Sequence, residues 1–391
     1  MRVCESPLCK VEFEPNTHNQ KYHDPRCKRD VENVSRRRAV QTEVALQQEA
    51  QVIQVPDVGE EEQIAYLRTT NQRLYRENIK LKVEKKEVAT AVYTAVREFL
   101  TKTPNAVVAP PREPTPRTTN EEVAIWVLSD WQYGKKTVTY NMAECEAAIA
   151  TYVDKALRIT DMQRSDHPVN EVKIWCLGDM LEGEAIFPSQ AHHIDGSLHA
   201  QVIRCAELIS KHVITPALEN YDRVKFVGIS GNHGAIGGRS RHEMHPETNA
   251  DRMIYSIVQL IHENDPRIEW DIPSGEHEGD FYTIDYIGEK KCMLFHGHQI
   301  KGSGAYRTIE NRVFAWRDII DERFDYAVCG HFHNPTRLTI NSAILFINGT
   351  TETSNGWAVE ELGKKGRPCQ YLLFGHPDHG ITAEYPIYLD L

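Results

Sequence analysis

The chain has 391 residues, enough for two domains, and its 40% hydrophobic and 26% charged residues are ordinary values for a globular protein. No run of about 18 uncharged apolar residues is present, which excludes a membrane-spanning helix. The formal net charge is −11 and is unevenly distributed. It is +3 (20 − 17) over residues 1–120 and −14 (25 − 39) over residues 121–391. This distribution excludes a strongly basic surface for binding nucleic acid.

The first segment, residues 1–36, combines cysteines and histidines with too few large apolar residues for a core. The spacing Cys4-x4-Cys9-x13-His23-x3-Cys27 gives two pairs of ligands separated by a loop, as structural zinc sites require. We predict a zinc-finger-like module in which these four residues bind one structural Zn²⁺. His18 is an alternative ligand, and a tail with free thiols is the alternative structure. The segment lacks the apolar region of a secretory signal, so we expect a cytoplasmic location, in the host cytoplasm if the chain is phage-encoded.

The second segment, residues 60–103, shows a heptad repeat. Leu67, Leu74, Leu81 and Val88 recur every seven residues, and the other seam contains Asn71 and Asn78. Buried Asn pairs fix register and strand number in parallel dimers. We therefore predict a coiled-coil helix that makes the chain a homodimer, the alternative being one long amphipathic helix packed on its own catalytic domain.

A proline-rich stretch follows. Residues 104–119 contain five prolines, which disfavour both helix and sheet. We expect residues 104–120 to be a linker and the last domain to cover residues 121–391.

That last segment alternates short β-rich apolar runs with helical patterns, for example at 142–160 and 198–220. The predicted strands are VAIWVLSD (123–130), VKIWCLGD (172–179), VKFVGISGN (224–232), KCMLFHGH (291–298) and DYAVCGHFH (325–333). This order predicts an α/β fold, and sites on such sheets lie at the carboxyl ends of the strands.

The ends of these five strands carry side chains of the kind that bind metals. In chain order they are Asp130 and Gln132, Asp179, Asn232 and His233, His296, and His331 and His333. One such residue alone would be explained by helix capping or by a hydrogen-bonded core histidine, but the whole set predicts a convergent site. Carboxylate, amide and imidazole ligands without a thiolate suit Mn, Fe, Zn or Ni.

The same segments resemble the five motifs of the calcineurin-like metallophosphoesterase superfamily. SDWQ (129–132), GDMLE (178–182), GNHG (231–234), FHGH (295–298) and GHFH (330–333) correspond to the family's DxH, GDxxD, GNH followed by an acid, a lone His, and GHxH. The resemblance spans about residues 122–350 and implies a β-sandwich flanked by helices, with two metals at the strand ends. In layout the chain is most similar to the repair exonucleases and their phage or prophage relatives.

The resemblance also implies a role for each residue. Asp179 would bridge two divalent ions, Mn²⁺ being expected and Fe, Zn, Ni or Mg being alternatives. One ion would also bind Asp130, Gln132 and His333, and the other would bind Asn232, His296 and His331. The bridging hydroxide would be the nucleophile, with its pKa lowered by both ions, and His233 would protonate the leaving oxygen. His298, the second histidine of FHGH, is expected at the rim.

Three departures from the family pattern bear on these roles. Gln132 stands where the family has His, and an amide oxygen is a weaker ligand than imidazole. Glu182 replaces the second Asp of GDxxD and is expected to orient the His233 ring as a catalytic residue. Gly234 replaces the acid that follows GNH, so we expect Glu182 to take over more of that task.

Basic and aromatic residues after the motif strands are candidates for substrate binding. Lys135 and Lys136, Arg239 and Arg241, and Lys301 and Arg307 predict a local anionic-substrate rim, the alternative being ordinary solvated surface. Tyr133, Tyr306 and Trp131 are candidates for stacking on a base or for core packing.

Together these features predict a dinuclear phosphodiester hydrolase, a nuclease acting on DNA, with nucleic acid as its partner and without a membrane partner. A hydrolase of small phosphates or nucleotides is the first alternative, because the catalytic segment is acidic. A non-catalytic adaptor built from the zinc module and the coiled coil is the second, and only Gln132 favours it.

Overall fold

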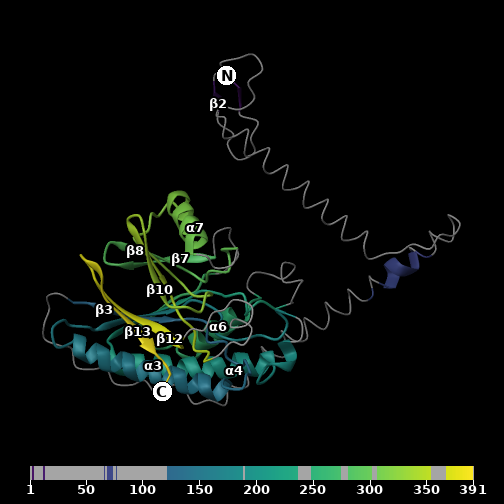
Figure 1. Ribbon diagram of the computed structural model, residues 1–391, viewed down its shortest axis with the longest axis horizontal. Coiled ribbons are helices and arrows are strands. Elements are labelled where there is room, and N and C mark those ends of the chain that lie inside the picture. Colours follow the sequence, from purple (N-terminus) through teal and green to yellow (C-terminus); the bar gives the residue numbers. More distant parts are fainter. Residues whose placement is uncertain are drawn as a thin grey trace. The chain divides into compact units, whose positions relative to one another are not determined.

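A computed structural model describes residues 2–3, 12–13, 66, 68–73, 76, 121–187, 190–236, 248–273, 281–301, 306–353 and 367–390 (Figure 1). The chain divides into two units, Met1–Thr90 and Ala91–Leu391. In the first unit, β1 (Arg2–Val3) pairs antiparallel with β2 (Glu12–Phe13). The predicted zinc ligands Cys4, Cys9, His23 and Cys27, most of the predicted coiled coil and the linker lie outside the described residues.

The second unit is built on two β-sheets. The first sheet has the order β13-β12-β3-β4-β5-β6, in which β3 to β6 are parallel and β12 is antiparallel to both of its neighbours. Its strands are β3 (Val123–Leu128), β4 (Glu171–Cys176), β5 (Arg223–Gly228), β6 (Ile268–Asp271), β12 (Cys369–His376) and β13 (Gly380–Tyr388). The second sheet has the order β10-β11-β9-β8-β7. Its strands are β7 (Tyr282–Ile287), β8 (Lys290–Phe295), β9 (Tyr326–Cys329), β10 (Thr336–Ile340) and β11 (Ala343–Ile347).

Helices cover one face of the first sheet because its parallel strands follow one another in chain order. Right-handed crossovers between successive strands then place every connecting helix on the same side. These helices are α3 (Met142–Gln163), α4 (Leu198–Ile209) and α6 (Ala250–Ile261), and a short 3-10 turn, η1 (Gln190–His192), precedes α4. In Figure 1, α3 and α4 both lie on this side of the sheet.

Both faces of the inner strands β12, β3 and β4 are buried, which explains why these strands read as continuous apolar runs. Trp126, Ile174 and Phe226 pack in the core beneath the helices. Their neighbours Val127, Trp175 and Val227 pack in a second core between the two sheets. The helix α7 (Tyr306–Ile319) covers the outer face of the second sheet. The predicted α/β architecture, a β-sandwich flanked by helices, is confirmed.

The predicted helical stretch 198–220 contains a break. After α4 the chain forms a π-helical turn, η2 (Ser210–Ile214), and continues as α5 (Thr215–Asn220). Pro216 has no N–H to donate and would collide with the carbonyl of an α-helical preceding turn, so a wider turn accommodates it. Within the described ranges, no helix is both long and apolar enough to span a bilayer.

Candidate functional site

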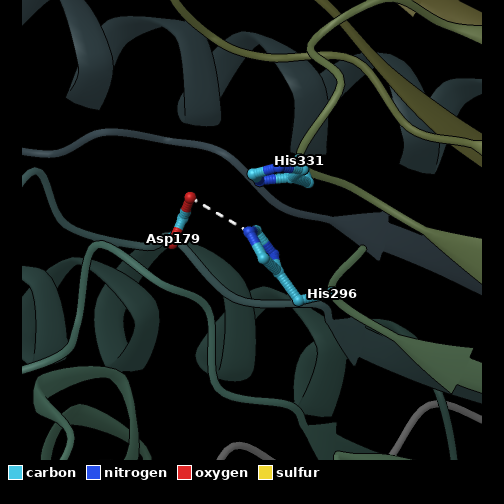
Figure 2. A group of neighbouring side chains, drawn as sticks. All are labelled: Asp179, His296 and His331. Atoms are coloured by element: carbon cyan, nitrogen blue, oxygen red, sulfur yellow. Dashed lines mark ion pairs between the residues drawn. The ribbon is translucent and has the colours of Figure 1, made fainter. Parts of the chain in front are cut away.

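The site lies at the edge where the parallel strands of both sheets end. Asp130 follows β3, Asp179 follows β4, and Asn232 and His233 follow β5. From the second sheet, His296 follows β8, and His331 and His333 follow β9. Asp179, His296 and His331 point toward one another (Figure 2), with one potential ligand atom of each lying within 4.8 Å of the others.

Asp179 is the centre of one half of this site. Its Oδ2 lies 3.0 Å from Nε2 of His296, and its Oδ1 accepts a 2.7 Å hydrogen bond from the backbone N–H of His233. Oδ1 of Asn232 lies 3.2 Å from the same Nε2. Because Nδ1 of His296 donates to the Leu177 carbonyl at 2.7 Å, Nε2 is the nitrogen left for a ligand. Metal-binding histidines are oriented by such a bond on the other ring nitrogen.

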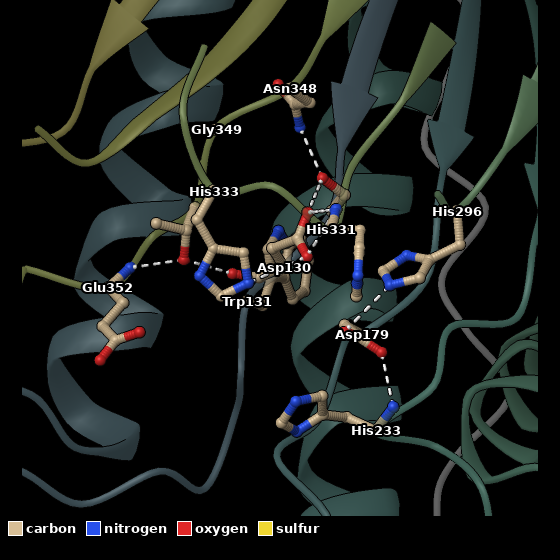
Figure 3. Close-up of polar contacts among 12 residues, drawn as sticks. Asp130, Trp131, Asp179, His233, His296, His331, His333, Asn348, Gly349 and Glu352 are labelled. Carbon is tan, nitrogen blue, oxygen red and sulfur yellow. Dashed lines mark hydrogen bonds and ion pairs between the residues drawn. The ribbon is translucent and has the colours of Figure 1, made fainter. Parts of the chain in front are cut away.

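Asp130 is the centre of the other half (Figure 3). Its Oδ2 accepts a 2.6 Å bond from Oγ of Ser129, and the backbone N–H of His331 donates to both carboxylate oxygens at 3.0 and 2.9 Å. Nε2 of His333 lies 3.3 Å from Oδ1. The two halves therefore meet at the turn that carries His331.

The backbone at these positions is unusual. Six non-glycine residues in the described part of the chain have positive φ, and five of them are predicted metal ligands: Asp130 (53°), Gln132 (48°), Asp179 (53°), His331 (68°) and His333 (55°). A left-handed conformation costs free energy for an L-residue and persists where the surrounding structure imposes it. The clustering of this strain at the predicted ligands is independent of the motifs and points to the same site.

Two motif glycines are required by the carboxylates. A Cβ on Gly231 would collide with Asp179, and a Cβ on Gly330 would collide with Asp130. The glycines of GNH and GHxH therefore allow the backbone to approach each buried carboxylate closely.

The charges of the site are shared between carboxylates and imidazoles. Burial alone would raise the pKa of Asp179, but His296 and His233 outweigh it and hold that pKa well below its ordinary value. Burial would lower the pKa of His296, but Asp179 raises it to about 9. Burial and the neighbouring His296 lower the pKa of His331 to about 4. In the metal-free protein, a proton on His296 thus neutralises the charge of Asp179.

These residues fit a divalent metal. Among the described residues, neither Asp130 nor Asp179 forms an ion pair with Lys or Arg, although each is at most 1% exposed. Buried carboxylates ordinarily require a charge partner. Carboxylate and imidazole groups, with an amide oxygen beside them, form a donor set typical of Mn, Fe, Zn or Ni.

Gln132 lies next to this set. Its backbone N–H donates to the Asp179 carbonyl at 3.1 Å, and its side chain is fully buried. In the described part of the chain, neither its amide oxygen nor its amide nitrogen has a hydrogen-bond partner. A buried polar group without a partner is costly, so this amide is available to a ligand.

His233 lies against Glu182. Nδ1 of His233 donates to the Glu182 carbonyl at 2.8 Å and lies 3.5 Å from Oε2 of the same residue. Burial alone would lower the pKa of His233, but Asp179 and Glu182 raise it to about 10. His298, predicted at the rim, is partly buried, with its ring centroid 5.4 Å from that of His296.

Asp251 is a site residue that the sequence reasoning missed. This fully buried side chain, in the first turn of α6, accepts hydrogen bonds from the backbone N–H groups of Asp179 (3.0 Å), Met180 (3.0 Å) and Gly231 (2.8 Å). A Cβ on Gly234 would lie 3.0 Å from Oδ2 of Asp251. Asp251 therefore places a carboxylate beside Gly234, the position at which this sequence lacks the acid of the motif.

A second missed group supports Asp130 from behind. Nδ2 of Asn348 donates to Oγ of Ser129 at 3.0 Å and to Oε1 of Gln370 at 3.1 Å. Oε1 of Gln370 in turn accepts from the Ser129 backbone N–H at 2.9 Å. These buried amides tie the end of β3 to β11 and β12 and so hold Asp130 in place.

The predicted substrate residues are less well placed. Arg239 and Arg241 lie outside the described residues, and Lys301 and Arg307 are exposed. Lys135 pairs with the buried Glu352 at 2.9 Å, so its charge is already neutralised.

Of the aromatic candidates, Trp131 and Tyr133 are fully buried and pack in the core, and Tyr306 is 49% exposed. Phe187, which the sequence reasoning missed, is 45% exposed, and its ring lies edge-on to His233 at 6.5 Å between centroids.

No protein-family model matches the chain, and no curated protein matches it. Among solved structures, it is similar to Vacuolar Protein Sorting 29 from Cryptosporidium parvum, with 16% identity over 69% of this chain and 98% of that one and a TM-score of 0.31. A novel archaeal phosphodiesterase matches at 12% identity over 68% of this chain and 99% of that one, with a TM-score of 0.30. A predicted phosphoesterase from Streptococcus pneumoniae matches at 11% identity over 68% and 98%, with a TM-score of 0.25. Because these identities and TM-scores are low, we draw neither activity nor substrate from these neighbours.

Proposed function

We propose that the chain is a metal-dependent phosphodiester hydrolase and that its substrate is DNA. The observation that carries the proposal is the convergence of Asp179, His296 and His331 at the shared edge of the two sheets, beside the Asp130–His333 pair. Two divalent cations held there would neutralise the phosphate oxygens and acidify a water molecule. Asp179 and Asp130 would hold these cations together with the imidazoles of His296, His331 and His333 and the amide of Asn232.

His233 is suited to protonate the leaving oxygen. Its Nδ1 is held by the Glu182 carbonyl, so Nε2 is the ring atom that carries a proton to the substrate. Its backbone N–H is fixed on Asp179, which keeps the ring beside the phosphate site.

Phe187 favours a substrate that carries a base, such as DNA, over a phosphate ester without one. An exposed aromatic ring at His233 offers a stacking surface to the base of the leaving nucleotide, and such stacking contributes about 1–3 kcal/mol per base. The predicted zinc module and coiled-coil dimer would add further contacts with a polymer and increase avidity. The −14 charge of residues 121–391 (25 − 39) instead favours a nucleotide or another small phosphate, which is our second candidate.

The test is a cleavage assay on the full-length protein with Mn²⁺. Labelled single-stranded DNA, double-stranded DNA and bis-p-nitrophenyl phosphate are offered to the wild type and to Asp179→Ala. We expect cleavage of DNA that Asp179→Ala abolishes and binding that weakens with salt. Cleavage of the small ester alone would support the second candidate, and cleavage of neither would contradict both.

Phe187 allows the stacking of a substrate base to be tested by itself. Phe187→Ala is expected to raise KM for single-stranded DNA by about tenfold, without changing KM for the small ester. Phe314, a similarly exposed phenylalanine (48%) on α7, is the matched control, and Phe314→Ala should change neither value.

A further inference from the structure

Gln190 is a buried side chain that no step of the proposed reaction uses. It is 0% exposed, and the three hydrogen bonds of its side chain all go to residues 182–186, the segment that supports His233. Its Nε2 donates to the carbonyl of Glu182 at 2.8 Å and to Oε1 of Glu182 at 2.9 Å. Its Oε1 accepts from the Ile186 N–H at 2.8 Å, which closes the loop over Glu182.

The two Glu182 groups that Gln190 holds are the same two that face His233. The Glu182 carbonyl accepts from Nδ1 of His233 at 2.8 Å, and the other carboxylate oxygen, Oε2, lies 3.5 Å from that nitrogen. Among the described residues, Oε2 has no hydrogen-bond partner, so rotation of the carboxylate is restrained through Oε1 alone. One amide group thus fixes both acceptors that orient the ring.

We infer that Gln190 is a positioning residue for the general acid: through Glu182 it keeps Nδ1 of His233 engaged and Nε2 directed at the leaving oxygen. This inference rests on the proposed function. It assigns Gln190 no contact with substrate or metal, so its loss should affect only steps that need a proton from His233.

Leaving groups of different basicity isolate that step. A nucleoside alkoxide must be protonated as it departs, whereas p-nitrophenolate is stable enough to leave without a proton. In the full-length protein with Mn²⁺, Gln190→Met should lower kcat for a dinucleotide by about 10–100-fold and leave its KM unchanged. The kcat for bis-p-nitrophenyl phosphate should fall by less than about threefold, and His233→Ala should show the same selectivity more strongly.

A second glutamine provides the matched control. Gln201 is also 0% exposed and anchors the same loop, since its Oε1 accepts from the Gly183 N–H at 2.9 Å and its Nε2 donates to the Gly196 carbonyl at 3.0 Å. It does not touch the Glu182 carboxylate. Gln201→Met should therefore lower the thermal midpoint as Gln190→Met does, without selectivity between the two esters. Gln190→Glu, which keeps the acceptor for Ile186 but loses the donor, should share the selectivity of Gln190→Met.

A spectroscopic readout is independent of turnover and of metal. In the metal-free protein, the Nδ1–H proton of His233 should give a downfield NMR resonance, identified by its absence in His233→Gln. Gln190→Met should shift that resonance or speed its exchange with water. The Nδ1–H proton of His296, which donates to Leu177, serves as an internal reference and should not change.

The outcomes separate this inference from the proposed function. Equal loss of kcat on both esters in Gln190→Met, the same selectivity in Gln201→Met, or an unchanged His233 resonance would overturn the positioning role. A wild type that cleaves neither ester would contradict the proposed function, and the NMR comparison would then decide the positioning role alone.

Discussion

Asp285 and Asp179 are both buried carboxylates of the two-sheet core, but the chain surrounds them differently. Asp285, on β7, lies between the sheets and pairs with Lys173 at 3.0 Å and with Lys225 at 3.2 Å. It also accepts from Nε1 of Trp175 at 2.8 Å. Asp179, at the edge where the sheets end, has an imidazole and a backbone N–H as partners. Two lysines balance the charge of Asp285, whereas only titratable imidazoles face Asp179 among the described residues.

This difference separates two uses of a buried carboxylate. Lys173 and Lys225 pair with Asp285, and these two ion pairs hold β4 and β5 of one sheet against β7 of the other. An imidazole beside Asp179 can exchange its proton for a metal ion, because the neutral ring is a metal ligand. We therefore expect substitutions in the first cluster to affect stability and substitutions in the second to affect metal binding and activity.

The largest expected effect is that of Asp179→Ala. Removal of this carboxylate should lower Mn²⁺-dependent turnover by at least about a hundredfold, because a charge expected to hold the cations is lost. A ligand that binds only the folded state at a hundred times its Kd stabilises it by about 2.7 kcal/mol, and this Mn²⁺-induced stabilisation should disappear as well. Differential scanning fluorimetry with and without Mn²⁺ measures it. An undiminished thermal shift in Asp179→Ala would place the metal elsewhere.

The next largest effect is that of Asp285→Ala, which should be confined to stability. It leaves the two lysines without their shared carboxylate, and breaking a buried pair in this way costs about 3–5 kcal/mol. Denaturant unfolding measures the loss, and the Mn²⁺-induced thermal shift should remain. The triple variant Asp285→Leu, Lys173→Met, Lys225→Met should recover most of the loss because no buried charge is left unpaired. Glu269, the other partner of Lys225, is solvent-exposed.

The pH dependence of that loss has a defined sign. Burial alone would raise the pKa of Asp285, but Lys173 and Lys225 outweigh it and hold that pKa below its ordinary value. The contribution to stability is therefore present above the unfolded-state pKa of about 3.9 and is lost as the pH falls through the folded-state value. The difference in stability between wild type and Asp285→Ala should be constant from pH 6 to 8 and shrink below pH 4. A difference that grows in acid would contradict the assignment.

Asp251→Asn should have a smaller effect, on metal affinity. The carboxylate holds the loops after β4 and β5 together by accepting three backbone N–H bonds, and an amide would turn its own N–H₂ toward one of these donors. Losing such support of a metal ligand costs about 10–100-fold in affinity. Mn²⁺ titration calorimetry measures the change. Asp265→Asn is the control, because Asp265 follows the other end of α6 and pairs with Arg267.

How well the sequence predicted these clusters depends on how far apart along the chain the contacting residues lie. The strand-end ligands were predictable because apolar runs mark the strands and because the carboxyl ends of parallel strands share an edge. Asp251 was not predictable, since its neighbours lie 20 and 72 residues away and a first-turn Asp on a helix is ordinarily a solvated cap. The Ser129–Gln370 contact joins residues 241 positions apart, and it depends on β12 pairing antiparallel with β3. The lysines around Asp285 likewise meet it only when the two sheets pack.

The smallest expected effect is a coupling between Mn²⁺ binding and proton release. Only the Asp179 cluster should show it. Asp179 raises the pKa of His296 to about 9, so Nε2 of His296 carries a proton at pH 7 in the metal-free protein. A metal binds the neutral imidazole, and its binding must therefore release that proton. Between pH 7 and 9 the apparent affinity for Mn²⁺ should rise by up to about tenfold per pH unit for each proton released, and it should level off above pH 9, where His296 is already neutral. Calorimetric titrations in two buffers of different ionisation enthalpy count the protons. Release that persists undiminished above pH 9 would assign the proton to another group, and its absence at pH 7 would mean that His296 is not a ligand.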